Sequence, residues 1–81
     1  MRIHVQFWSY FADLAGTGSF ELEVPPGARI AAAIDAIEQQ FPPLAAARRC
    51  ALVAVGLDYA PPDQELHEGD ELSLFPPVQG G

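Results

Sequence analysis

The eight prolines of this chain all occur as adjacent pairs, and this arrangement constrains the fold more than any other feature of the sequence. Proline has no backbone N–H and a fixed φ, so a pair of prolines interrupts a helix or an inner strand. The pairs divide the chain into five pieces, and each piece is expected to hold complete elements. The pairs are Pro25-Pro26, Pro42-Pro43, Pro61-Pro62 and Pro76-Pro77.

The first piece predicts two strands, because apolar and polar residues alternate over residues 2–7 and again over residues 19–24. A period of two with one apolar face is typical of a half-buried strand. Between these strands, Phe11 and Leu14 are three residues apart, which favours one turn of helix. The apolar strand positions are Ile3, Val5 and Phe7 in the first strand and Phe20, Leu22 and Val24 in the second.

The second piece predicts the main helix over residues 27–41, and Pro42 ends it. Its four large apolar residues recur at spacings of four, three and four, which places them on one helical face. Alanine fills most other positions and favours a helix. The start of the helix has no Ser or Asp as N-cap residue, so Gly27 or Ala28 must take the N-cap position. The four apolar residues are Ile30, Ile34, Ile37 and Phe41.

The remaining pieces predict a short helical turn over residues 44–49, a buried strand over 51–55, a very short strand at Tyr59 and a last strand over 71–75. The complete order predicts an α+β chain: a single-domain β-grasp (ubiquitin-like) fold over residues 1–77, with a mixed sheet packed on one main helix. We expect a right-handed crossover to return the third strand beside the first. The final strand is then expected to lie centrally, parallel to the first.

The formal net charge of −7 constrains the partners of this chain, because eleven acidic residues are set against four arginines and no lysine. Such a surface repels phosphate groups, which argues against binding nucleic acid or an anionic membrane. It suits a protein partner with a basic docking face; the alternative is that negative charge only keeps the chain soluble. The sequence has neither a secretory signal nor an apolar run of membrane-spanning length, so we expect a cytoplasmic location.

The sequence shows no set of residues that could make the chain an enzyme by itself. Cys50 is the single cysteine, which excludes an internal disulfide, and we expect a small buried hydrophobe rather than a catalytic thiol. His4 and His67 lie apart, without the spacing of metal ligands. A chain of 81 residues also has little room for an enclosed active site. We therefore expect it to be non-catalytic alone, with no metal and no stably bound cofactor.

The last seven residues, FPPVQGG, form the most distinctive stretch of the sequence. Phe75 closes the predicted last strand, and Pro76 and Pro77 favour an extended exit from it. Residues 78–81 are expected to be a flexible Gly-Gly tail that reaches about 13–14 Å, at roughly 3.3–3.6 Å per residue. Glycine has no Cβ, so such a tail can enter a narrow channel of a partner. A frayed terminus without a role is the alternative.

With these stretches in view, the chain resembles the MoaD/ThiS family of sulfur carriers, and within it the MoaD-like small subunits of molybdopterin synthase. The resemblance covers nearly the whole chain. Its most specific part is the ending, in which Gly-Asp-Glu leads into the last strand and Phe-Pro-Pro-Val is followed by one residue and the terminal glycines. The stretches that carry it are VQFWSYFADLAG, VPPGARIAAAIDAI, LHEGDELSLFPPV and QGG.

The resemblance implies that Gly81 is the reacting residue and that the catalytic side chains belong to the partners. An E1-like adenylyltransferase would adenylate Gly81 with ATP, and a sulfurtransferase would supply the sulfur that makes a thiocarboxylate. The tail would then enter the large subunit of molybdopterin synthase and give sulfur to cyclic pyranopterin monophosphate, in molybdenum cofactor biosynthesis. Gly80 and Gln79 would lie in the partner's channel. The partner-binding residues would be Phe75, Pro76, Pro77 and Val78.

For docking, we expect Phe75 and Val78 to be apolar anchors, with three acidic residues steering the approach of the partner: Glu68, Asp70 and Glu71. Three other functions stay open. The chain could carry sulfur for thiazole or cysteine synthesis, it could be a ubiquitin-like modifier joined through Gly81 to lysines of other proteins, or it could be a β-grasp interaction domain whose tail is idle.

Overall fold

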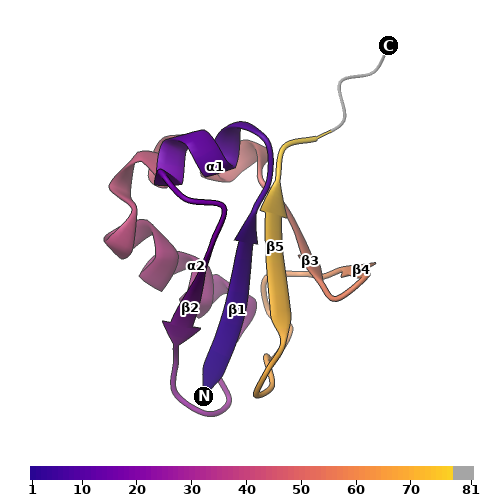
Figure 1. Ribbon diagram of the computed structural model, residues 1–81. Coiled ribbons are helices and arrows are strands. Elements are labelled where there is room, and N and C mark those ends of the chain that lie inside the picture. The colour runs from indigo at the N-terminus through magenta and orange to yellow at the C-terminus, as the bar shows by residue number, and fades with distance from the viewer. Residues whose placement is uncertain (78–81) are drawn as a thin grey trace.

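The computed structural model describes residues 1–77, which form one mixed five-stranded sheet with its helices packed on one side (Figure 1). The elements in chain order are β1 (Arg2–Phe7), α1 (Tyr10–Ala15), β2 (Ser19–Glu23), α2 (Ile30–Gln40), the 3₁₀ helix η1 (Pro42–Cys50), β3 (Leu52–Val55), β4 (Asp58–Tyr59) and β5 (Glu71–Phe75). Across the sheet the strands follow the order β2-β1-β5-β3-β4, which is the β-grasp arrangement that the sequence predicts. The predicted tail, residues 78–81, lies outside the described residues.

Strands β1 and β5 run parallel at the centre of the sheet, with Val5 opposite Leu72. This confirms the predicted position of the final strand. The expectation that β3 returns beside β1 is wrong, because β5 lies between them and pairs antiparallel with β3. The right-handed crossover rule applies to parallel strands. The connection that leads to β3 starts from β2 and passes through α2, and β2 and β3 run parallel, because β2 is antiparallel to β1 and β3 is antiparallel to β5. The rule gives the handedness of this connection but not the place of β3 in the sheet.

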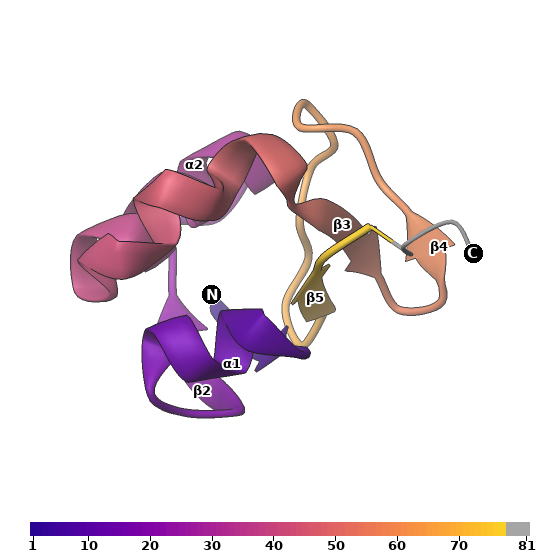
Figure 2. The ribbon, with the colours of Figure 1, turned by 90° about the horizontal axis from the view of Figure 1, so that it is seen from above.

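The core lies between the sheet and α2, which crosses one of its faces (Figure 2). From α2 come Ile30, Ala33 and Ile37, all of them fully buried. The predicted apolar face is therefore shifted, since Ile34 and Phe41 are only half-buried. Ala33, a small residue outside the predicted apolar face, thus belongs to the buried face of the helix. The inward side chains of the two central strands are Ile3, Val5, Phe7, Leu72 and Leu74.

The first turn of α2 is capped by backbone carbonyl groups of a distant loop, residues 60–66, rather than by a side chain. Arg29 is the N-cap residue and its side chain makes no cap hydrogen bond. Instead, the N–H of Ile30 donates to the carbonyl of Gln64 at 3.0 Å, and the N–H of Ala31 donates to that of Pro62 at 2.9 Å. These bonds satisfy donors that every helix leaves unpaired at its start. The weak cap expected from the sequence is thus replaced by a tertiary contact.

The helical turn expected over residues 44–49 is a longer 3₁₀ helix, which spans Pro42–Cys50. The Arg48 guanidinium ties it to α2, since one of its nitrogens lies 2.7 Å from an Asp35 oxygen and 3.2 Å from a Glu38 oxygen. These carboxylates raise the pKa of Arg48, with the Asp35 hydrogen bond as the main cause.

The prediction that Cys50 is buried is wrong, because its side chain is exposed. Cys50 is the last residue of η1, and the chain packs against the core again from Ala51 onward. Its thiol lies 3.5 Å from the hydroxyl of Tyr10 and 3.5 Å from the carbonyl of Ala47. The hydrogen bond with Cys50 raises the pKa of Tyr10 above its ordinary value.

Two further findings concern only residues 1–77. None of the helices there has the length and the apolar character needed to cross a membrane. In the same range, His, Cys, Asp and Glu side chains do not gather in groups of three or more that could hold a metal ion.

The loop over residues 60–66 is expected to contribute to stability through Leu66, which is 1% exposed and whose N–H donates to the carbonyl of Ala28 at 2.8 Å. Leu66→Ala should lower the free energy of unfolding by about 2–5 kcal/mol, because it removes a buried side chain and leaves a cavity. Urea denaturation measures the change. The matched control is Leu57→Ala, at a fully exposed position, which should change stability by less than about 0.5 kcal/mol. Equal losses in the two variants would contradict a core role for Leu66.

Candidate functional site

The described part of the chain ends just beyond the last residue of β5. α1 and the start of β3 lie at this same end of the strands (Figure 1). Hydrogen bonds on both sides hold the last residues of β5. Phe75 is opposite Leu52 of β3, and the N–H of Trp8, which follows β1, donates to the carbonyl of Leu74 at 3.0 Å. Because β5 is a central strand, the point at which the chain leaves the sheet is fixed by its neighbours.

Of the predicted site residues, the structure describes three. Phe75 is half-buried, with its ring 5.8 Å from that of Tyr59 between centroids, Pro76 is half-buried and Pro77 is exposed. The other four predicted site residues lie outside the described part of the chain: Val78, Gln79, Gly80 and Gly81. Their roles in the partner's channel and at the reacting carboxylate stay predictions.

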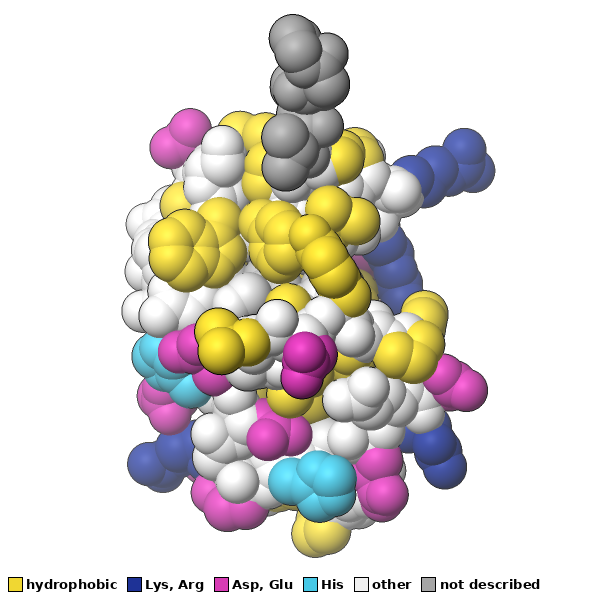
Figure 3. Space-filling model, turned by 90° about the vertical axis from the view of Figure 1, so that its right-hand side faces the viewer, with side chains coloured by type: hydrophobic (Ala, Val, Ile, Leu, Met, Phe, Trp, Pro, Cys, Tyr) yellow, Lys and Arg dark blue, Asp and Glu magenta, His cyan; other side chains and the backbone are white. Residues whose placement is uncertain are grey.

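Beside this exit, the face of the sheet that turns away from α2 carries an apolar groove with a volume of about 460 Å³. We call it the outer groove. Small residues of the central strands, Ala54 and Ser73, form its floor, and both are 8% exposed. Figure 3 shows hydrophobic side chains gathered at this end of the molecule, above a zone rich in acidic side chains. The other residues that line the groove are Trp8, Gly56, Leu57, Tyr59 and Phe75.

The walls of the outer groove are large side chains exposed to solvent. Trp8 is 53% exposed, Tyr59 is 69% exposed and Leu57 is fully exposed. Single exposed apolar residues are common on protein surfaces, but a contiguous group that lines a groove marks an interaction site. Aromatic residues in such groups often supply most of the binding energy of an interface. The geometry therefore describes a surface suited to protein binding.

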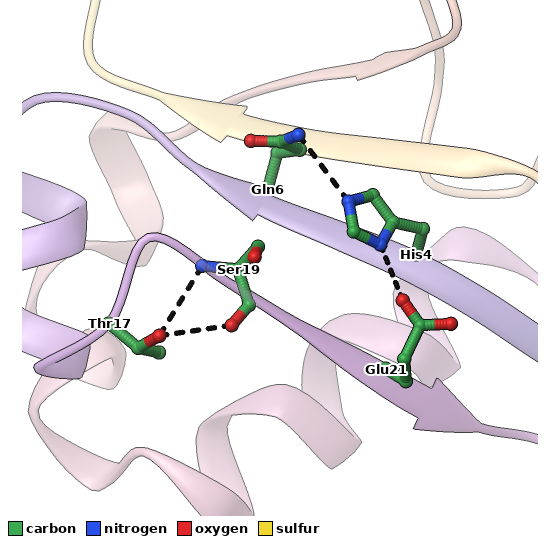
Figure 4. Close-up of polar contacts among 5 residues, drawn as sticks. All are labelled: His4, Gln6, Thr17, Ser19 and Glu21. Carbon is green, nitrogen blue, oxygen red and sulfur yellow. Dashed lines mark hydrogen bonds and ion pairs between the residues drawn. The ribbon is translucent and has the colours of Figure 1, made fainter.

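The other half of the same sheet face, on β1 and β2, is polar and internally paired (Figure 4). The His4 ring lies between the Glu21 carboxylate, with which it forms an ion pair, and the Gln6 amide at 3.4 Å. Next to them, the Thr17 hydroxyl donates to the carbonyl of Ser19 at 3.0 Å. Of these contacts, the His4–Glu21 pair joins β1 to β2, and cross-strand pairs of this kind stabilise a sheet face that is exposed to water. The face is therefore divided into a polar half and an apolar half.

The three acidic residues predicted to steer the partner, which we call the rim acids, all lie at the start of β5 or in the turn before it. Glu68 and Asp70 belong to the turn before β5, at the opposite end of that strand from Phe75. There the Glu68 carboxylate accepts the N–H of Arg2 at 3.1 Å, and the Asp70 carboxylate accepts the N–H of His67 at 2.8 Å. Both acids thus have local structural contacts.

Glu71 is placed differently. It has the same orientation on β5 as Ser73 and Phe75, because alternate residues of a strand share a face. Leu72 and Leu74, between them, point into the core. Glu71 is therefore the one of the three rim acids that shares a face with the outer groove.

The sequence analysis missed Trp8, Leu57, Tyr59 and Ala54 as site residues. The signal for Trp8 was available, since the alternation that turns Phe7 inward must turn Trp8 outward. No such signal marks Ala54, because the run from 51 to 55 is apolar throughout and does not reveal which side chains face the core. The groove also depends on the pairing of β3 with β5, which brings together residues far apart in the sequence.

Comparison with known proteins places this geometry in context. The model of the ThiS family matches residues 5–81. A molybdopterin synthase sulfur carrier subunit from Arabidopsis thaliana is 27% identical over 81 residues, which cover all of this chain and 84% of that protein.

Two solved structures are similar along nearly their whole length. SAMP1 from Haloferax volcanii has a TM-score of 0.92 and 26% identity, with all of both chains covered. A putative molybdopterin converting factor, subunit 1, from Pyrococcus furiosus has a TM-score of 0.90 and 29% identity, covering 96% of this chain and 99% of that one. These likenesses confirm the predicted β-grasp fold, and the family match over almost the entire sequence shows that the chain belongs to the ThiS family.

Proposed function

We propose that this chain is the sulfur carrier subunit of a molybdopterin synthase, with Gly81 as the residue that carries the sulfur. The observation that carries the proposal is the family match over residues 5–81, which includes the terminal Gly-Gly. The names of the relatives from Arabidopsis thaliana and Pyrococcus furiosus support this pathway over thiazole or cysteine synthesis. The position of the described chain end, next to an apolar groove, supports a role in which the C-terminal residues enter a partner.

The proposed reaction begins with activation of the Gly81 carboxylate. A carboxylate is unreactive toward nucleophiles, so an E1-like adenylyltransferase joins it to the α-phosphate of ATP and releases pyrophosphate. The persulfide sulfur of a sulfurtransferase then displaces AMP and forms an acyl disulfide with Gly81. A thiol reductant cleaves that disulfide and leaves a thiocarboxylate at Gly81. ATP is thus consumed by the activating partner, and this chain needs no cofactor of its own.

In the second stage, the large subunit of the synthase takes up the tail and catalyses transfer of the sulfur to cyclic pyranopterin monophosphate. The name of the Arabidopsis thaliana relative, a carrier subunit of a synthase, supports the expectation of a further subunit. Two rounds of transfer supply the two sulfurs of the dithiolene. This chain contributes a tail of the right length and a surface that binds the partner. Gln79 and Gly80 pass through the partner's channel, and Phe75 to Val78 bind at the mouth of that channel.

A second function is favoured by the similarity to SAMP1 from Haloferax volcanii. Another solved structure from that organism spells this name out as small archaeal modifier protein 1. In that function the activated Gly81 would form an isopeptide bond with a lysine amine of another protein. Mass spectrometry of the chain from cells separates the two functions. Replacement of oxygen by sulfur at Gly81 supports the carrier, and branched peptides that end in Gly-Gly on lysines of other proteins support the modifier.

Deletion of Gly81 should abolish sulfur transfer while thermal melting stays unchanged, because the core lies within residues 1–77. The shortened chain still ends in a glycine carboxylate, but it loses about 3.3–3.6 Å of reach. Misplacement of a reacting atom by about 1 Å can cost on the order of a hundredfold in rate. Thiocarboxylate formation is measured with ATP, the activating enzyme and a sulfur donor.

The matched variant for this test is Gly81→Ala, which keeps the length and adds one methyl group beside the reacting carbonyl. It should be the milder lesion of the two. A deletion variant that forms the thiocarboxylate and sulfurates the pterin at the wild-type rate would contradict the carrier function.

The thiocarboxylated chain alone should not convert cyclic pyranopterin monophosphate, since the outer groove has no set of acid, base and nucleophile among the described residues. Addition of the large subunit should start the reaction. Product formation is followed by chromatography of the pterin with each protein alone and with both together. Turnover by the carrier alone would show that the catalytic groups belong to this chain.

A further inference from the structure

We propose that the free border of β2, which we call the β2 edge, binds an extended basic segment of another protein as an added antiparallel strand. In the sheet β2 pairs only with β1, and it forms the border opposite the short strand β4. The inference goes beyond the proposed function and does not rest on it, because β2 lies at the border of the sheet farthest from β3 and β4 and takes no part in the exit of the chain from β5.

The ladder between β1 and β2 shows which backbone groups belong to the β2 edge. The N–H of Phe7 donates to the carbonyl of Gly18 at 2.8 Å, and the N–H of Val24 donates to that of Met1 at 2.9 Å. In an antiparallel pair, alternate residues of a strand direct both of their backbone groups to the same neighbour. The even-numbered residues of β2 therefore face β1, and its odd-numbered residues direct their N–H and carbonyl groups away from the sheet.

Thr17 closes the first part of the β2 edge (Figure 4). Its hydroxyl donates to the carbonyl of Ser19 at 3.0 Å and accepts the N–H of the same residue at 3.5 Å. Glu21 and Glu23 come next, and within residues 1–77 their outward N–H and carbonyl groups have no hydrogen-bond partner. These two residues therefore offer a donor and an acceptor each to an added strand. Strand addition of this kind obtains affinity from main-chain hydrogen bonds and specificity from alternate side chains.

On the inner face, the β2 edge requires apolar residues in the added strand. Residues directly opposite one another in neighbouring strands project from the same face of the sheet. Leu22 projects inward and is 6% exposed. Phe20, on the same face, is half-buried and packs against the half-buried ring of Phe41, with 4.9 Å between the centroids. Residues of the added strand opposite Phe20 and Leu22 would cover this apolar surface, so apolar side chains fit there.

On the outer face, the β2 edge requires basic residues. The side chain of Glu21 is 51% exposed and that of Glu23 is 70% exposed. Each carboxylate has a contact on the β1 side, with His4 and Arg2 respectively, and a basic side chain of an added strand would reach it from the other side. Opposite charges across a strand pair stabilise it. The fitting segment therefore alternates basic and apolar residues, with the basic ones opposite the two glutamates.

The same charges disfavour a second copy of this chain as the added strand. A free strand edge is a hazard for aggregation, and charged side chains on it are a usual protection. Two β2 edges brought together would set Glu21 and Glu23 close to the same residues of the other copy, and like charges across a strand pair are destabilising. The formal net charge of −7 adds to this repulsion. The edge thus repels its own copies while it attracts a basic strand.

The probe for this site is a short synthetic peptide in which lysine and valine alternate. The full chain, labelled with ¹⁵N, is titrated with this peptide and followed by NMR. The amide resonances of Glu21 and Glu23 should shift and their exchange with solvent should slow, because these N–H groups become hydrogen-bonded. The control peptide has the same composition, with its lysines and valines in separate blocks. It carries the same charge without the two faces, so it should bind at least about tenfold more weakly.

Two substitutions at one position separate the backbone from the charge. Glu23→Gln keeps the N–H and removes the charge, so it should weaken binding a few-fold at low salt. Glu23→Pro also removes the outward N–H, which an edge strand tolerates, and should weaken binding by a further factor of about two to ten, the effect of one lost hydrogen bond. Asp63→Asn removes one charge from an exposed loop position and should bind as the wild type does.

A modified peptide provides the backbone test without any change to the protein, and it takes the place of Glu23→Pro if thermal melting shows that variant to be unfolded. The alternating peptide is methylated on the backbone nitrogens of its lysines, which are the donors that would face the β2 edge. Because the remaining N–H groups lie on its other border, this peptide should bind at least about tenfold more weakly than the unmodified one.

Shifts centred on the β2 amides, with weaker binding of the block and methylated peptides, would support the added strand. Equal binding of the alternating, block and methylated peptides would show attraction by charge alone and overturn the proposal. Unchanged Glu21 and Glu23 amides with the alternating peptide present would also overturn it. Slower exchange of these amides at rising concentration of this chain alone would show that a second copy occupies the edge, which is equally contrary to it. Each of these results leaves the carrier function to the tests at Gly81.

Discussion

The parallel pairing of β1 with β5 joins the first strand of the chain to the last, and most other features of the molecule depend on it. It completes the sheet face on which α2 packs, since inward residues of these two strands form the centre of the core. It also closes nearly the whole chain into one loop, with His4 opposite Glu71. Contacts between residues so distant in sequence form late and slowly in folding. The exit of the chain beside α1 is therefore established only when the whole domain has folded.

The two faces of the sheet that this pairing completes have different roles, one in the core and one at the surface. The inward face holds Ile3, Val5 and Leu72, all fully buried, and these residues stabilise the fold. The outward face carries the polar pairs of β1 and β2 on one half and the outer groove on the other. Substitutions on the outward apolar half can alter recognition without reaching the core. The division explains how a chain of 81 residues can keep an exposed apolar surface and still have a compact interior.

Much of the fold could be predicted from the sequence because its patterns are local. The alternation in residues 2–7 and the helical spacing of Ile30 and Ile37 each reflect one element, and the proline pairs mark where elements end. What could not be predicted depends on contacts between elements. Ala33 is fully buried while Ile34 is only half-buried, and Cys50 is exposed at the end of η1.

The candidate site also has one part that local sequence patterns predict and another part that depends on contacts between elements. The sequence pattern predicts Phe75 to Pro77 and the terminal glycines as site residues, and their roles stay predictions. The outer groove could not be predicted, because it exists only when β3 and β4 pair beside β5. The apolar run of residues 51–55 is compatible with burial on both faces, and nothing within it distinguishes the floor of a groove from the middle of a core.

The capping of α2 by the loop over residues 60–66 has a consequence for how the molecule opens. Proline cannot donate a hydrogen bond, but it keeps its carbonyl, and Pro62 uses it to accept the N–H of Ala31. The helix start and this loop therefore cannot separate without breaking hydrogen bonds in both, and Leu66 would leave the core at the same time. Segments linked in this way open as one cooperative unit. The amides of Ile30, Ala31 and Leu66 should thus exchange with solvent together, and an insertion into this loop would loosen the helix rather than only lengthen a connection.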